Sequence, residues 1–332
     1  MARFFLLIEM DNIEARVIYM GTPAFAVAPL QALFNAGVDI CAVVTVPDKP
    51  SGRGQKLTMS PVKLFAIEHQ IPVLQPISLK ADEFVDVIKS LQADVIIVVA
   101  FRMLPEVIWR VPKYGTFNLH ASILPRYRGA APINWAIING DTETGLTTFF
   151  INESIDAGEI LLQERISINE EETAGELHDR MMPVGSALVI RTLNGIINKD
   201  ITPVCQSENE EVVISQAPKI FKTDCRINFQ HTRKKVLNHI RGLSPYPSAY
   251  LSLESPSGQV FQMKVFKAIK SEASTLPPFG LKTDGKSFIE VGTANGEICL
   301  IDLQLESKKR MNVIDFLRGF EMNNQWKILN QL

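Results

Sequence analysis

The chain has 332 residues, of which 46% are hydrophobic and 21% are charged. This length is typical of about two domains, and the composition excludes an intrinsically disordered chain. No apolar run approaches the ~20 residues that a membrane-spanning helix needs. The four cysteines (Cys41, Cys205, Cys225, Cys299) are scattered without metal-ligand spacing. This usage indicates a reduced, cytoplasmic compartment.

Charge is divided unevenly along the chain. Residues 1–217 carry 17 Lys and Arg against 26 Asp and Glu, a net of −9. Residues 218–332 carry 17 against 10, a net of +7. Such asymmetry suggests that the C-terminal part faces a polyanion.

Strands are expected to alternate with helices in the N-terminal part. Residues 1–15 are expected to be an extension rather than a signal peptide, because their apolar run is short and acids follow at Glu9 and Asp11. Apolar runs predict strands at 16–21, 39–46, 93–101, 115–121, 144–153 and 159–168. Helical spacing predicts helices at 23–37, 60–70, 83–92, 131–140 and 173–196. This order predicts an α/β fold with a doubly wound, mostly parallel Rossmann-like sheet, whose ligands bind outside the carboxyl ends of its strands.

The C-terminal part has a different pattern. Residues 198–217 are polar and irregular and are interpreted as a linker. Beyond them, short strands at 248–255, 259–268, 287–293 and 297–305 follow a helix at 232–243 and precede one at 312–320. Short strands separated by turns predict a small β-barrel of the oligonucleotide-binding (OB-like) kind. The expected domains are therefore residues 16–197 and 218–332.

The first strand–helix turn argues against two common cofactors. Its sequence, YMGTPAFA, supplies the single Gly21 instead of the glycines of a dinucleotide fingerprint. The sequence also lacks a phosphate-binding loop of the G-x-x-x-x-G-K-[ST] type. A reaction that depends on NAD or ATP is therefore disfavoured.

The stretch FNLHASILPRYRG, residues 117–129, places two polar residues at the end of a predicted strand. Residues two apart in a strand share a face, so Asn118 and His120 can point into one space. An Asn amide can donate to a developing oxyanion, and a His can move a proton near neutral pH. Alternatively, both side chains satisfy backbone groups at the strand end. The following loop contains Arg126 and Arg128, which either hold an acidic ligand or are solvated turn residues.

A third polar residue, Asp156, lies in SIDAG between two apolar strands. It fits an ordinary turn aspartate with Gly158 two residues on. It also fits a carboxylate that orients His120 and biases its protonation. The residues alone leave both interpretations open.

Residues 117–162 closely resemble the core of formyltransferases that use 10-formyltetrahydrofolate. The segments VIYMGTPAFAV (17–27), VTVPDKPSGRGQKLTMSPVKLFA (44–66) and GLSPYPSAYL (242–251) resemble the tRNA branch of that superfamily, the methionyl-tRNA formyltransferases. The resemblance runs from about residue 16 to the C-terminus. It implies that residues 16–197 form the formyltransferase catalytic domain and residues 218–332 a basic tRNA-binding domain.

The resemblance also implies roles for individual residues. The catalytic Asn, His and Asp of the family fall on Asn118, His120 and Asp156. The segment that cradles the folate falls on Ser122, Ile123, Leu124 and Pro125. Two positions depart from the family pattern. Ala121 replaces a usual glycine, and Ala100-Phe101-Arg102 replaces a usual Ala-Tyr-Gly near the pterin pocket.

Basic residues outside this core are interpreted as tRNA contacts. The glycine- and proline-rich loop 47–60 exceeds an ordinary βα connection of ~2–6 residues. Its Lys49, Arg53 and Lys56 either form a solvated surface loop or an arm that closes on the acceptor end of a tRNA. The C-terminal candidates are Lys219, Lys222, Lys234, Lys235 and Arg310.

The expected activity is transfer of the formyl group of 10-formyltetrahydrofolate to the α-amino group of methionyl initiator tRNA, in translation initiation. No metal is expected to take part, and the protein is expected to be a monomer. Two alternatives remain. A formyltransferase acting on an amino-sugar nucleotide or a purine precursor would share Asn118, His120 and Asp156. A catalytically inactive RNA-binding homologue would keep only the fold.

Overall fold

The computed structural model describes residues 14–51, 56–206, 215–272 and 275–330, which form two compact units. The first unit comprises residues 1–128, 145–166 and 179–215. The second unit comprises residues 129–144, 167–178 and 216–332. Each unit has its own sheet and its own hydrophobic core.

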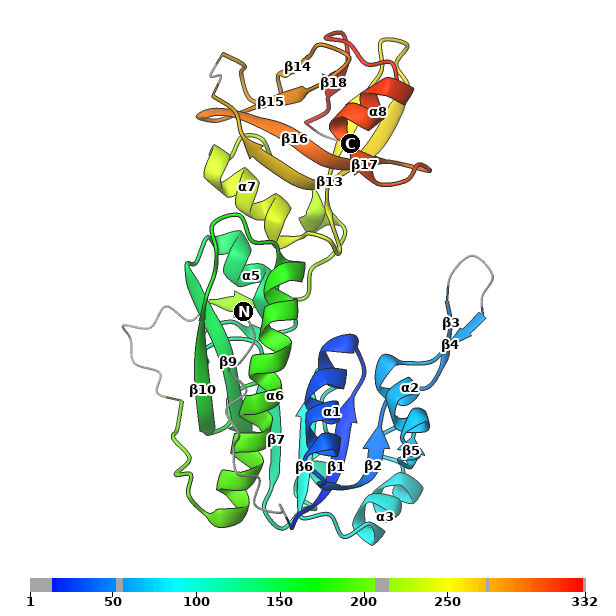
Figure 1. The fold of residues 1–332 in the computed structure, drawn as a ribbon, viewed down its shortest axis with the longest axis vertical. Coiled ribbons are helices and arrows are strands. Elements are labelled where there is room, and N and C mark those ends of the chain that lie inside the picture. Colours follow the sequence, from blue (N-terminus) through cyan, green and yellow to red (C-terminus); the bar gives the residue numbers. More distant parts are fainter. Residues whose placement is uncertain (1–13, 52–55, 207–214, 273–274, 331–332) are drawn as a thin grey trace. The chain divides into compact units, whose positions relative to one another are not determined.

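A seven-stranded sheet organises the first unit, with strand order β10-β9-β7-β6-β1-β2-β5 (Figure 1). Neighbouring strands from β5 to β7 run parallel, and β9 joins β7 antiparallel. The strands are β1 (Arg16–Gly21), β2 (Asp39–Val44), β5 (Val73–Leu74), β6 (Val95–Val99), β7 (Thr116–His120), β9 (Glu143–Phe150) and β10 (Ile160–Ser167). The unbroken apolar run of β6 is buried along its whole length, as a central parallel strand requires.

Helices cover both faces of this sheet. On one face, Ile96 and Val98 of β6 pack with Phe84 of α3 and Ile108 of α4. On the other face α6 approaches closely, since a Cβ added at its Gly185 would lie 3.0 Å from the side chain of Leu119. The helical elements are η1 (Ala24–Ala26), α1 (Val27–Asn35), α2 (Pro61–Glu68), α3 (Asp82–Ser90), α4 (Glu106–Trp109) and α6 (Ala174–Asn198).

The loop 47–60 contains short strands that its composition did not reveal. β3 (Lys49–Ser51) and β4 (Lys56–Thr58) pair antiparallel, and Arg53 lies outside the described residues. After β4, helix α2 begins as its sequence predicts. Ser60 caps it by accepting a hydrogen bond from the backbone N–H of Lys63 at 3.1 Å, and Pro61 occupies the first helical position.

The second unit is built on an antiparallel sheet with strand order β14-β15-β16-β13-β12-β18, with β17 paired to β16. Its strands are β12 (Ala249–Glu254), β13 (Val260–Lys270), β14 (Leu281–Thr283), β15 (Ile289–Thr293), β16 (Gly296–Leu305), β17 (Met311–Asn312) and β18 (Lys327–Ile328). Register shifts in β13 between Val265 and Ala268 mark an irregularity of the kind that bends strands around a barrel. The sheet is a nearly closed barrel, so both predicted folds are confirmed.

Helices complete the second unit. Val236 and Ile240 of α7 and Phe316 of α8 enter the barrel core, which also contains Phe229 and Leu303. The remaining helical elements are α5 (Pro132–Asn139), η2 (Thr223–Cys225), α7 (Arg233–Gly242) and α8 (Val313–Gly319). Two short strands, β8 (Arg128–Gly129) and β11 (Gln216–Ala217), form a separate two-stranded sheet.

These units differ from the expected domains of residues 16–197 and 218–332. Helix α5 belongs to the second unit because it packs on α7, where the Asn134 amide donates to the carbonyl of Gly242 at 2.7 Å. Part of the segment that is expected to be a linker pairs with the first unit. Val204 exchanges backbone hydrogen bonds of 2.7 and 2.9 Å with Ile160 of β10, so this part of the segment belongs to the first unit.

Candidate active site

Strand β7 carries Asn118 and His120 on the same face. Asn118 pairs with Val98 of β6 and with Phe149 of β9, and His120 is the last residue of the strand. Val98 faces the core beneath α3 and α4, so the Asn118 and His120 side chains leave the sheet on that side. The carboxyl end of a parallel strand is where ligands of doubly wound sheets bind.

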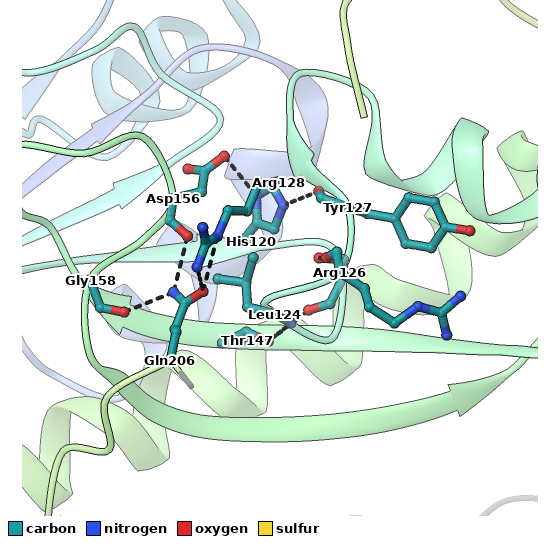
Figure 2. A network of polar contacts seen from close by, with 10 residues as sticks. His120, Leu124, Arg126, Tyr127, Arg128, Thr147, Asp156, Gly158 and Gln206 are labelled. Carbon is teal, nitrogen blue, oxygen red and sulfur yellow. Dashed lines mark hydrogen bonds and ion pairs between the residues drawn. The ribbon is translucent and has the colours of Figure 1, made fainter. Parts of the chain in front are cut away.

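The imidazole of His120 is buried and held by a backbone carbonyl. Its Nε2 lies 2.8 Å from the carbonyl oxygen of Tyr127 (Figure 2). A carbonyl can only accept, so this contact assigns a proton to Nε2. The other ring nitrogen, Nδ1, faces Asp156, whose Oδ2 lies 3.9 Å away. This contact could not be predicted from the sequence, because the main chain of Tyr127 makes it and not the side chain.

Asp156 reaches His120 from the loop between β9 and β10. Its backbone is left-handed, with φ of 51°, which Asp tolerates better than most residues. The loop lies against β9 so closely that a Cβ at Gly158 would fall 1.6 Å from the carbonyl oxygen of Phe150. The 3.9 Å separation from Nδ1 is longer than a hydrogen bond. The Tyr127 carbonyl holds the ring directly, and the expectation that Asp156 orients His120 and biases its protonation stays a prediction.

The side-chain oxygen of Asn118 is an unsatisfied acceptor. Oδ1 is buried and has no hydrogen-bond partner among the residues that the structure describes. A buried polar atom without a partner costs free energy, about 1–3 kcal/mol in typical cases. Such an atom beside His120 is suited to accept an N–H from a ligand.

The loop after His120 is fixed by polar contacts, including those of Thr147. The Thr147 hydroxyl donates to the carbonyl of Ser122 at 2.7 Å and accepts from the N–H of Leu124 at 3.1 Å. The Gln163 amide donates to the Leu124 carbonyl at 2.9 Å. Ser122 and Leu124 are buried, whereas Ile123 and Pro125 are partly exposed. Of the four expected folate contacts, Ile123 and Pro125 therefore offer side-chain surface.

Arg128 is oriented by a residue that sequence reasoning missed. The Gln206 Oε1 accepts from Arg128 Nε at 3.1 Å and from Nη2 at 2.7 Å. The Gln206 amide nitrogen donates to the carbonyls of Asp156 at 3.0 Å and Gly158 at 2.8 Å. Figure 2 shows these contacts beside His120. Gln206 lies in the segment interpreted as a linker, where a single Gln carries no distinguishing pattern.

The atypical stretch 100–102 forms a local clamp. Ala100 directly follows β6 and has a left-handed backbone, with φ of 48°. The guanidinium of Arg102 donates to the backbone carbonyl of Pro76 and, at 2.9 Å, to that of Ile77. Burial lowers the pKa of Arg102 from its usual value. Arg102 therefore ties the end of β6 to the segment after β5.

The expected tRNA-binding cations have different surroundings. In the first unit, Lys49 is exposed and Lys56 lies in β4. In the second unit, Arg310 pairs with Asp302 through Nε at 2.8 Å and lies over the Phe266 ring at 4.2 Å. Arg310 is thus partly engaged within the barrel. Exposed lysines of the second unit include Lys219, Lys222, Lys234 and Lys235.

Two kinds of feature are absent from the part of the chain that the structure describes. Within 14–51, 56–206, 215–272 and 275–330, no helix is both long enough and apolar enough to cross a membrane. Over the same residues, no group of three or more His, Cys, Asp or Glu side chains is arranged to hold a metal ion.

Solved structures share this fold at low sequence identity. A sugar 3N-formyl transferase determined with dTDP and 5-N-formyl-THF has a TM-score of 0.61 and 19% identity, over 89% of this chain and 99% of its own. HypX from Aquifex aeolicus, in complex with tetrahydrofolic acid, has a TM-score of 0.58 and 18% identity, over 91% of this chain and 47% of its own. At these identities the likeness concerns the fold alone.

Sequence comparisons are more specific. The chain is 48% identical to the methionyl-tRNA formyltransferase of Bacteroides thetaiotaomicron, over 96% of this chain and 100% of that protein. It is 45% identical to that of Flavobacterium johnsoniae, over 95% and 99% of the two chains. Family models described as formyl transferase and formyl transferase, C-terminal domain, match residues 15–193 and 219–321. The chain therefore belongs to the formyl transferase family, and the relatives that it matches over nearly its whole length are methionyl-tRNA formyltransferases.

Proposed function

We propose that the protein transfers the formyl group of 10-formyltetrahydrofolate to the α-amino group of methionine esterified to initiator tRNA. The observation that carries the proposal is the convergence of Asn118, His120 and Asp156 at the carboxyl end of β7. Near-full-length similarity to methionyl-tRNA formyltransferases supports the choice of acceptor. The product would serve translation initiation, and a cytoplasmic location and a monomeric state remain predictions.

The proposed chemistry divides the work between three side chains. When bound, the folate co-substrate supplies an activated formyl carbon. The neutral amine forms a C–N bond to this carbon, and the bond from the carbon to N10 then breaks. The Asn118 amide N–H donates to the oxygen that gains negative charge, while its Oδ1 accepts an N–H of the amine. Preorganised donors of this kind stabilise the transition state.

His120 has the role of proton carrier. Because Nε2 donates to the Tyr127 carbonyl, Nδ1 is the ring nitrogen that can take the proton of the attacking amine. The Asp156 carboxylate, 3.9 Å from Nδ1, stabilises the imidazolium that results. His120 then delivers the proton towards the leaving N10. The net reaction conserves the proton and needs no oxidant or reductant.

The surroundings of the site are compatible with a folate. Ile123 and Pro125 offer partly exposed apolar surface in the loop that follows His120. Ile155, next to Asp156 in sequence, is 67% exposed and is a further apolar side chain available to a ligand. Ser122 and Leu124 would shape the cradle through the backbone contacts that fix them. The pterin would approach the end of β6, where Arg102 fixes the backbone.

The acceptor tRNA is assigned to the basic residues outside this centre. The arm formed by β3 and β4 would present Lys49, Arg53 and Lys56 to the acceptor end. Exposed lysines of the second unit would contact phosphates. Arg310 is a weaker candidate because it pairs with Asp302. Phosphate contacts fix register without reading sequence, so initiator selection is expected to depend on the acceptor end.

A direct experiment compares single-turnover formyl transfer by the wild type with Asn118→Ala and His120→Ala. Loss of an oxyanion donor typically costs ~10²–10³ in turnover, and we expect that loss in each variant with an unchanged thermal unfolding midpoint. Wild-type turnover in either folded variant would remove that residue from the mechanism. Absence of transfer by the wild type would refute the activity itself.

One second candidate has support from a specific observation. The solved neighbours include an N-formyltransferase from Helicobacter canadensis in complex with folinic acid and dTDP-3-aminofucose, at a TM-score of 0.61 and 19% identity. An amino-sugar nucleotide acceptor would use the same three catalytic side chains. It would not require a domain of net charge +7, which favours the tRNA acceptor.

A further inference from the structure

The side chain of Gln206 makes four hydrogen bonds that join three separate segments of the first unit. Its Oε1 accepts two from Arg128, and its Nε2 donates to the carbonyls of Asp156 and Gly158. Both atoms of the amide are thus used with the polarity that an amide offers. Glu in this place would lose the donor, and an apolar residue would lose both functions.

The Gln206 amide nitrogen donates to the backbone of a strained turn, residues 156–158. Asp156 has a left-handed φ of 51°, a conformation that costs energy and persists only where the surrounding structure enforces it. The two carbonyls that Gln206 binds, at residues 156 and 158, lie in the same turn as the catalytic carboxylate. The adjacent Val204–Ile160 pairing fixes the backbone from which Gln206 projects, through hydrogen bonds of 2.7 and 2.9 Å.

We propose that Gln206 is a positioning residue for formyl transfer, which holds the Asp156 turn so that the carboxylate faces Nδ1 of His120. The inference rests on the proposed function. Gln206 reaches neither His120 Nδ1 nor the Asn118 amide in the contacts described, so it acts through the Asp156 turn. We therefore expect its substitution to change the rate of the chemical step. Arg128, held by Oε1, is the second group that Gln206 orients.

The two halves of the amide can be separated by substitution. Gln206→Glu keeps an acceptor for Arg128 but cannot donate to the two carbonyls. Gln206→Ala removes both halves. If the turn is the target, both variants lower kcat by at least about tenfold, since small displacements of a catalytic group can cost 10²-fold. KM for the tRNA should change less than threefold. If Arg128 alone matters, Gln206→Glu keeps the wild-type kcat and the proposal fails.

A double-mutant cycle distinguishes positioning from a general structural effect. In an Asp156→Asn background the carboxylate is already lost, so Gln206→Ala should lower kcat by less than about twofold further. Multiplicative losses would show that Gln206 does not act through Asp156. Gln31→Ala, on an exposed position of α1, is the matched control and should keep wild-type kinetics.

A measurement without catalysis separates failure of this inference from failure of the proposed function. Hydrogen exchange of residues 154–158 should be faster in Gln206→Ala than in the wild type and in Gln31→Ala. Unchanged exchange in a folded Gln206→Ala variant would overturn the positioning role. Faster exchange in a protein that transfers no formyl group would uphold the contact and refute the activity.

Discussion

Each ring nitrogen of His120 has its own partner, and this separation defines what the residue can do. Nε2 is bound to the Tyr127 carbonyl at 2.8 Å, and in the proposed mechanism Nδ1 therefore exchanges the proton with the substrate. The carboxylate of Asp156 lies on the Nδ1 side but at 3.9 Å, beyond hydrogen-bond length. The structure therefore places the Asp156 carboxylate on the side of the ring that the Tyr127 carbonyl leaves open.

Asp156→Asn tests whether the charge of Asp156 contributes to the reaction. Asn preserves the shape of the side chain and tolerates a left-handed backbone, but it carries no charge. We expect kcat for formyl transfer to fall by about 10²-fold, the lower end of typical general acid–base contributions. The measurement is single-turnover transfer at saturating concentrations of both substrates.

Asp156→Glu provides the control for charge. It restores the carboxylate on a longer side chain, so we expect partial recovery relative to Asp156→Asn. Equal activity of Asp156→Asn and the wild type, with both proteins folded, would exclude a role for the charge.

Some residues of the candidate site could be placed from the sequence, and others could not. Asn118 and His120 could be placed together because alternation along a strand is a strict geometric rule. The proximity of Asp156 could be inferred only through family resemblance, since 36 positions separate it from His120. The contact of the Tyr127 carbonyl was inaccessible, because every residue has a carbonyl and only the folded loop aims this one.

At the element scale, the arm of β3 and β4 starts from a fixed base. Lys63, near the start of α2, donates to Asp48 Oδ2 at 2.6 Å and to Gln75 Oε1 at 2.8 Å. The Gln75 amide donates to Asp48 Oδ1 at 2.9 Å and to the Val46 carbonyl at 2.8 Å. Hydrogen bonds from Lys63 and then Gln75 lower the pKa of Asp48. Asp48 directly precedes β3, so this group defines where the arm leaves the unit.

Lys63→Met is expected to weaken acceptor binding more than chemistry. The substitution keeps the aliphatic stem but removes the cation that Asp48 and Gln75 share, so the arm loses its preferred position before tRNA binds. Hydrogen bonds to charged groups contribute about 1.5–3 kcal/mol, and we expect KM for charged tRNA to rise by about tenfold. Lys89→Met, exposed in the last turn of α3, is the control. A lower kcat with unchanged KM would contradict this role.

Long periodic elements were predictable and short ones were not. Helix α2 could be placed from Ser60 and Pro61, and β6 from its unbroken apolar run, because capping and burial leave local patterns. β3, β4 and β5 have three residues or fewer, too few to establish alternation. The Val204–Ile160 bridge depends on a tertiary contact, so its segment resembled a linker.

Across the whole molecule, composition located the change from acidic to basic charge but not the limits of the two units. The excess of basic residues begins near residue 218, and the barrel does lie there. Helix α5 nevertheless belongs to the second unit, because its contacts are with α7. The first unit in turn retains residues 200–206, which contain Gln206. Each unit is therefore assembled from chain segments that sequence order separates.

The proposed function combines a catalytic centre in the first unit with a basic second unit that serves a tRNA acceptor. It is tested most directly by radiolabelled formyl transfer from 10-formyltetrahydrofolate to three acceptors in parallel: methionyl initiator tRNA, a dTDP-linked amino sugar and glycinamide ribotide. We predict that kcat/KM for the tRNA exceeds that for either small acceptor by at least about 10³, because phosphate contacts add binding that small molecules cannot obtain. Equal or better transfer to a small acceptor, or no transfer to the charged tRNA, would contradict the proposed function.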